Sequence, residues 1–137
     1  MADDLGKLLQ AAADSWQAQL RGALADHTPA AALGAGAAVL PHLGGASLLQ
    51  TELTARMGLS KQAVQQLLDQ LETQGLVRRV PDAADKRAKR VELTESGAAA
   101  AAKRQHAEAV LEDGLREGLG KKRFKSLRKA LRELSAG

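Results

Sequence analysis

Residues 60–74 carry polar side chains whose type and spacing suit the reading of DNA bases. Apolar residues recur here at positions i, i+3, i+4 and i+7, which is the spacing of the buried face of a helix. That inward face comprises Val64, Leu67, Leu68 and Leu71. The outward positions then fall on Lys61, Gln62, Gln65, Gln66, Asp69 and Gln70. Glutamine amides can form two hydrogen bonds to adenine, and a lysine can bind phosphate or guanine. The candidate DNA contacts are therefore Lys61, Gln62, Gln65 and Gln66, together with Ser60, which caps the helix.

A basic segment follows this helix. Six cations lie between residues 78 and 90 against two carboxylates: Arg78, Arg79, Lys86, Arg87, Lys89 and Arg90. Residues 76–80 and 90–93 have the composition of strands, and the polar stretch 81–89 between them predicts a hairpin turn. Cations at a hairpin tip can contact phosphates or a minor groove, and the candidates are Lys86, Arg87 and Lys89.

Two carboxylates in the same turn are better explained by structure than by DNA contact. Asp82 and Asp85 would repel phosphate, but a carboxylate can hold a turn by accepting hydrogen bonds from local amides and from a neighbouring arginine. We therefore expect Asp85 to orient Arg87 or Arg90, and we assign Asp82, Asp85 and Arg90 to the internal support of the hairpin.

Helices are predicted on both sides of this region. The N-terminal helix covers residues 3–25 and ends at the break before Pro29. Thr28 then caps a second helix, which is rich in alanine and glycine and runs to about Leu43. Residues 46–49 could form one small strand. Thr51 is expected to cap a short helix over residues 52–57 that ends at Gly58.

The C-terminal third is also predicted to be helical. Thr94 caps a long helix from Glu95 to about Leu115, and Gly118 and Gly120 interrupt it. A last helix over residues 121–134 has an apolar edge that we expect to be buried: Phe124, Leu127, Leu131 and Leu134. Further cations on this helix are best read as a solvated face.

Composition supports a mainly helical fold that needs a partner. The 137 residues suit one domain, only 1% are aromatic, and alanine and leucine supply most of the apolar weight. Helices of this kind bury little surface each, so we expect a second subunit to complete the core. The net charge of +4 is too small to be diagnostic by itself.

Several classes of protein are disfavoured. The absence of cysteine excludes disulfides and thiolate metal sites, and the histidines at 27, 42 and 106 are too scattered to predict a metal site. There is no phosphate-binding loop, nucleophile motif or apolar carboxylate pair, so neither an enzyme nor a cofactor is predicted. The sequence has no apolar run of membrane-spanning length and no secretory signal at its start, so a cytoplasmic protein is expected.

Residues 53–97 resemble the MarR family of winged helix-turn-helix bacterial transcription regulators. The apolar spacing from Val64 to Leu71 and four patterns carry the resemblance: Gly58-Leu59-Ser60, Leu71-Glu72-x-x-Gly75-Leu76-Val77, Asp82-x-x-Asp85-Lys86-Arg87 and Leu93-Thr94-x-x-Gly97. The helix order of the family also fits the flanking segments, so the resemblance implies one MarR-like domain over residues 1–137. Its winged-helix lobe would span residues 28–97, and residues 1–27 and 98–137 would be dimerisation helices.

The resemblance also implies a function. It implies a homodimer that binds double-stranded DNA at a pseudo-palindromic operator, with the helix at 60–74 in the major groove and the hairpin, or wing, at a minor groove. It further implies a repressor that a small-molecule effector releases, with Trp16 and His42 near the effector pocket.

The sequence departs from the family pattern at two wing positions. Ala84 and Lys86 stand where the family usually has arginine, which loses a guanidinium at the tip. Two alternatives therefore stay open: a winged helix that binds other proteins, and a nonspecific or architectural DNA-binding protein.

Overall fold

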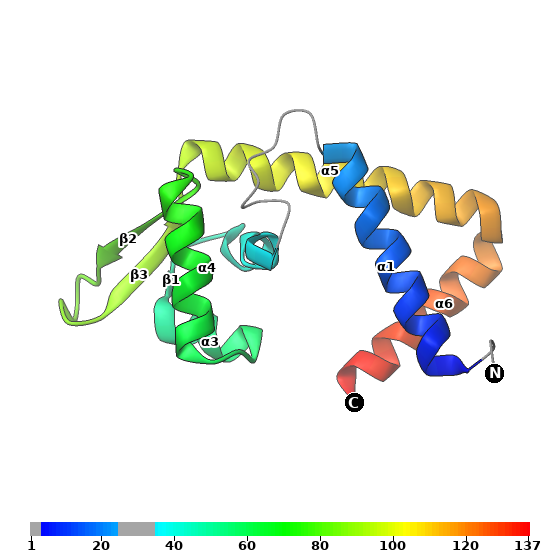
Figure 1. The fold of residues 1–137 in the computed structure, drawn as a ribbon, viewed down its shortest axis with the longest axis horizontal. Coiled ribbons are helices and arrows are strands. Elements are labelled where there is room, and N and C mark those ends of the chain that lie inside the picture. The colour runs from blue at the N-terminus through cyan, green and yellow to red at the C-terminus, as the bar shows by residue number, and fades with distance from the viewer. Residues whose placement is uncertain (1–3, 25–34) are drawn as a thin grey trace. The chain divides into compact units, whose positions relative to one another are not determined.

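The fold is mainly helical with a small antiparallel sheet, which confirms the predicted fold class (Figure 1). The computed structural model describes residues 4–24 and 35–137. The chain divides into two compact units, one from residues 1–22 and 105–137 and the other from residues 23–104.

The second unit contains the predicted helix-turn-helix and wing. Its elements are η1 (Ala35–Ala38), η2 (Leu40–Leu43), β1 (Leu48–Leu49), α3 (Gln50–Met57), α4 (Lys61–Thr73), β2 (Val77–Pro81), β3 (Lys89–Leu93) and residues 95–104 of α5 (Glu95–Leu119). All strand pairs are antiparallel, and the order in the sheet is β1-β3-β2. Val91 in the central strand lies opposite Leu48 on one side and Arg79 on the other. The sheet therefore joins the wing to the segment that precedes α3.

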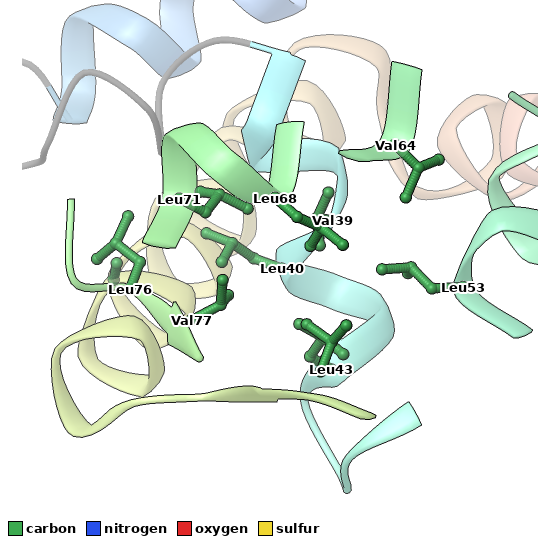
Figure 2. Packing of buried hydrophobic residues seen from close by; sticks show 11 residues of the cluster. Val39, Leu40, Leu43, Leu53, Val64, Leu68, Leu71, Leu76 and Val77 are labelled. Carbon is green, nitrogen blue, oxygen red and sulfur yellow. The ribbon is translucent and has the colours of Figure 1, made fainter. Parts of the chain in front are cut away.

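One apolar core holds these elements together. It contains Val39, Leu40, Leu43, Leu53, Val64, Leu68, Leu71, Leu76, Val77, Val91 and Ala100 (Figure 2). Three of the four predicted inward residues of α4 are buried, and Leu67 is half-buried against the same cluster. Because this stripe is fixed inside, the opposite face of α4 is turned to solvent.

The turn between α3 and α4 forms as predicted. Gly58 adopts a left-handed conformation with φ +65°, and its N–H donates to the carbonyls of Thr54 and Ala55. Ser60 caps α4, since its Oγ accepts from the N–H of Ala63 at 3.1 Å. The left-handed residue after α4 is Gly75, with φ +74°.

Two predicted details of the first half of the lobe are wrong. A single helix from Pro29 to Leu43 is not found over the described part: residues 35–43 form the 3₁₀ helices η1 and η2, and Pro41, which has no N–H to donate, lies in the second. The predicted break and cap at residues 26–29 lie outside the described residues. Thr51 does not cap α3, which begins at Gln50. Leu49 precedes that helix, and its N–H donates to Glu52 Oε1 at 3.2 Å.

The first unit contains α1 (Leu5–Leu24) as far as residue 22, the distal part of α5 (Glu95–Leu119) and α6 (Lys121–Ala136). α5 continues through Gly118, contrary to the predicted interruption, because one glycine costs a long helix only about 1 kcal/mol. The chain turns at Gly120, where φ is +85°.

Of the predicted buried edge of α6, only the first residue is buried in the single chain. Phe124 is buried, and the guanidinium carbons of Arg116 and Arg128 lie 4.7 and 5.1 Å from its ring centroid. By contrast, the exposed fractions of the three leucines are 40% for Leu127, 42% for Leu131 and 65% for Leu134. Within the described residues of this single chain, all three leucines therefore remain exposed.

Candidate nucleic-acid interface

The predicted DNA-contacting side chains of α4 and of its cap are all exposed. Ser60, Lys61, Gln62, Gln65 and Gln66 are exposed, and they occupy the N-terminal half of the helix. Their backbone is rigid because the other face of the helix packs in the core (Figure 2). The helix thus offers amide and ammonium groups on a fixed scaffold, which is what groove recognition requires.

The tip of the wing is closed by hydrogen bonds that centre on Asp82. Its N–H donates to the carbonyl of Ala88 at 2.9 Å, and the N–H of Ala88 donates to the carbonyl of Asp85 at 2.9 Å. Asp82 Oδ2 also accepts from the amides of Ala84 and Asp85, at 3.1 and 3.0 Å. The carboxylate therefore organises the turn that displays the basic residues.

Arg90 connects the turn of the wing to the segment before β1. It donates from Nη1 to Asp82 Oδ1 at 3.0 Å, from Nε to Ser47 Oγ at 2.9 Å and from Nη2 to the carbonyl of Ser47 at 3.2 Å. The hydrogen bond from Arg90, followed by that from the Asp85 amide, holds the pKa of Asp82 below its usual value. Since its donors are engaged, Arg90 connects the wing to the segment before β1.

The other wing cations extend into solvent. Asp85 Oδ1 accepts from the N–H of Arg87 at 3.0 Å and from its Nε at 3.2 Å, so Arg87 rather than Arg90 is the partner of this carboxylate. The side chain of Arg87 is nevertheless 94% exposed, and Lys86 and Lys89 are exposed as well. These three residues form the cationic surface of the wing tip.

A second ion-pair network joins α4 to β2. Arg79 donates from Nη2 to Glu72 Oε1 at 2.9 Å and also to Asp69 Oδ1, while its backbone N–H donates to Glu72 Oε2 at 3.2 Å. The hydrogen bond between the two side chains is the main cause that lowers the pKa of Glu72 and raises that of Arg79.

Sequence reasoning missed both Ser47 and the role of Arg79. Ser47 is separated from Arg90 by 43 residues, and only the pairing of β1 with β3 brings them together. The sequence does contain a signal for Arg79, because two carboxylates near the end of α4 precede an arginine early in the next strand. That order predicts an ion pair only if the strand is known to pack beside the helix.

The two residues predicted to line an effector pocket lie in different units. Trp16 is half-buried on α1, and His42 is half-buried in η2. An open hollow in the first unit is lined by neither of them; its lining residues are Leu119, Lys122, Arg123, Ser126 and Leu127. The predicted pocket therefore stays a prediction.

Residues 4–24 and 35–137 contain neither a cluster of metal-ligating side chains nor a membrane-spanning helix. No group of three or more His, Asp or Glu side chains there is placed to hold a metal ion. No helix in that part of the chain combines the length and apolarity needed to cross a membrane.

Comparison with known proteins connects this geometry with DNA. The sequence profile of the MarR family matches residues 37–88, and no curated protein sequence matches the chain. A single-site mutant of MarR from E. coli, solved in complex with operator DNA, is 26% identical with a TM-score of 0.79, covering 95% of this chain and 92% of that one. The transcriptional repressor CouR, solved bound to a 23-mer DNA duplex, is 26% identical with a TM-score of 0.84, covering 98% of this chain and 94% of that one. A probable transcriptional regulator from Pseudomonas aeruginosa is 21% identical, with a TM-score of 0.79 and coverage of 96% and 97%, and shows the shared fold.

Proposed function

The chain belongs to the MarR family of winged-helix transcription regulators, and from that premise we propose that it is a homodimeric repressor that binds a specific DNA operator. One observation carries the proposal: α4 exposes a row of polar side chains next to a rigidly supported basic wing. Both relatives described above with DNA are similar to this chain over more than nine tenths of its length. Because such an operator would lie on the bacterial chromosome, the proposal includes a cytoplasmic location.

Exposed leucines support the homodimer. Leu5, Leu8 and Leu9 on α1 are 67%, 49% and 42% exposed, and the uncovered leucines of α6 lie in the same unit. On each of these helices the exposed leucines follow helical spacing and form one apolar edge, which is typical of an interaction site. In a symmetric dimer, two copies of α4 would enter successive major grooves, about 34 Å apart along the duplex.

Release by a small molecule completes the proposed mechanism, and it rests on family membership alone. A ligand that favours a different spacing of the two recognition helices by a few kcal/mol would empty the operator. Trp16, the only tryptophan of the chain, provides a fluorescence signal for screening such ligands.

The first experiment is selection of bound duplexes from a random pool by the purified protein. We expect an enriched inverted repeat with half-sites about one helical turn apart. The Gln62→Ala/Gln65→Ala variant should then lose affinity for this duplex more than for random DNA. If the variant loses the same factor of affinity for the selected duplex and for random DNA, these residues do not recognise the base sequence.

A second experiment separates the proposal from its two alternatives. If the wing tip contacts DNA, Lys86→Ala weakens binding to all sequences and reduces the slope of log K against log salt by about 0.9. A winged helix that binds only proteins would show no salt-dependent duplex binding. An architectural protein would bind selected and random duplexes with comparable affinity.

The dimer is tested by sedimentation of Leu131→Asp, which places a charge on the exposed edge of α6. We expect this variant to be monomeric. Leu59→Asp is the matched control, since Leu59 is 45% exposed but lies in the turn before α4. A Leu131→Asp variant that remains dimeric would contradict an interface on α6.

A further inference from the structure

We infer that Arg79 is a positioning residue: it neutralises two carboxylates on the DNA-reading face of α4 and fixes that helix against the wing without contacting DNA itself. The inference rests on the proposed function and deepens it. It also explains why an arginine and two carboxylates occupy an interface that is expected to meet phosphates.

The carboxylates lie on the same helical face as the candidate base readers. Asp69 is seven residues after Gln62, four after Gln65 and three after Gln66, and these spacings stack side chains on one face of a helix. Glu72 continues the row by one further turn. Both carboxylates are in the C-terminal half of α4, where the helix dipole disfavours negative charge.

Uncompensated carboxylates at these positions would oppose DNA binding. Asp69 and Glu72 have exposed side chains, so each would face the duplex if α4 entered a groove. A phosphate or a base acceptor near either of them would be repelled. Their charge must therefore be offset within the protein.

Arg79 provides this compensation and ties α4 to the sheet at the same time. Its guanidinium bonds both carboxylates, and its backbone N–H bonds Glu72 a second time, at 3.2 Å. The strand that carries Arg79 is itself held by pairing with buried Val91. The C-terminal half of the recognition helix is thereby attached to the base of the wing.

The surroundings of Arg79 differ from those of a phosphate-binding arginine. Its side chain is only 20% exposed, whereas that of Arg87 at the wing tip is 94% exposed. Its Nη2 donates to both carboxylates, and the hydrogen bond to Glu72 is the main cause that raises the pKa of Arg79 and lowers that of Glu72. An arginine that is mostly buried and paired with two carboxylates is better placed to orient those carboxylates than to bind a phosphate of DNA.

The preceding residue gives a matched control. Arg78 also lies in β2 and also forms an ion pair, with Glu92 at 2.7 Å, but its side chain points to the other face of the hairpin. Arg78→Met and Arg79→Met therefore make the same change of charge in adjacent positions, and only the second breaks the link to α4.

The test compares binding of four proteins to the selected duplex and to random DNA: wild type, Arg78→Met, Arg79→Met and Glu72→Gln. We expect Arg79→Met to reduce the ratio of specific to random affinity by about ten-fold, the equivalent of one charge-assisted hydrogen bond. Arg78→Met should leave this ratio unchanged. Circular dichroism at the assay temperature checks that each variant is folded.

Glu72→Gln is the decisive variant because it keeps the shape of the side chain and removes a negative charge. If Arg79 positions α4, this variant loses specific affinity even though electrostatics alone would favour tighter binding. If Arg79 instead binds phosphate, Glu72→Gln frees it and both duplexes bind more tightly, while Arg79→Met weakens both equally. That result, or unchanged ratios in both variants, would overturn the inference.

Failure of the inference is distinguishable from failure of the proposed function. If the wild-type protein itself shows no preference for any duplex, the proposed function is wrong. If the wild type is specific and the Arg79 and Glu72 variants keep its specificity, only the positioning role is wrong.

Discussion

Substitution of Gly97 tests how closely α5 packs on the turn that ends the recognition helix. A Cβ at Gly97 would lie 1.8 Å from the carbonyl oxygen of Leu76 and 2.8 Å from its carbonyl carbon. To restore a separation of 3.0 Å, one of the two segments must move by about 1.2 Å. Two hydrogen bonds cross the same contact: Thr94 N–H to the carbonyl of Leu76 at 3.0 Å, and Thr94 Oγ1 to the carbonyl of Gly75 at 2.5 Å.

These contacts give the expected size of the effect. Overpacking costs about 1–3 kcal/mol, and the loss of two hydrogen bonds adds about 1 kcal/mol each. Alanine in a helix recovers about 1 kcal/mol relative to glycine. Gly97→Ala should therefore lower the free energy of unfolding by about 2–4 kcal/mol.

The assay is urea denaturation followed by circular dichroism, at one fixed protein concentration because a dimer's stability depends on concentration. Gly114→Ala is the matched control, since Gly114 lies in the same helix and its added Cβ would meet nothing within 4 Å. It should stabilise the protein by up to about 1 kcal/mol. If Gly97→Ala proves as stable as the control, the close approach described here is wrong.

Three further predictions concern the core, the wing and the first unit. Leu68→Ala should cost about 2–5 kcal/mol in urea denaturation because its side chain is fully buried; a loss below 1 kcal/mol would contradict the packing of α4. Because Arg90 lowers the pKa of Asp82, their interaction stabilises the lobe above the usual carboxyl pKa of about 3.9 and is lost as the pH falls through the lowered pKa. Asp82→Asn should therefore weaken the dependence of the free energy of unfolding on pH between about pH 5 and pH 2. If that pH dependence is unchanged in the variant, the interaction of Asp82 with Arg90 does not cause it. Phe124→Leu keeps an apolar side chain but loses two cation–π contacts, so it should destabilise the protein by about 1–2 kcal/mol; thermal denaturation with no change in midpoint would show that these contacts contribute nothing.

Local features of the lobe could be predicted from sequence because each depends on near neighbours. The inward stripe of α4, the Ser60 cap and the left-handed Gly58 follow from helical period, capping chemistry and backbone sterics. The strands of the wing were predicted to within a residue at each end, for similar reasons.

Partners and exposure were decided by tertiary structure. Arg90 selects Asp82 and the distant Ser47 rather than Asp85, because strand pairing determines which groups come within hydrogen-bond reach. The helical spacing of the leucines on α6 predicts a buried edge, yet Leu131 is exposed in the single chain. Spacing identifies the apolar face of a helix but does not say what covers that face. Sequence by itself thus determined the helices and strands of the helix-turn-helix and the wing, together with the apolar face of α4, because these depend on near neighbours. The pairing of charges between elements required their packing in three dimensions.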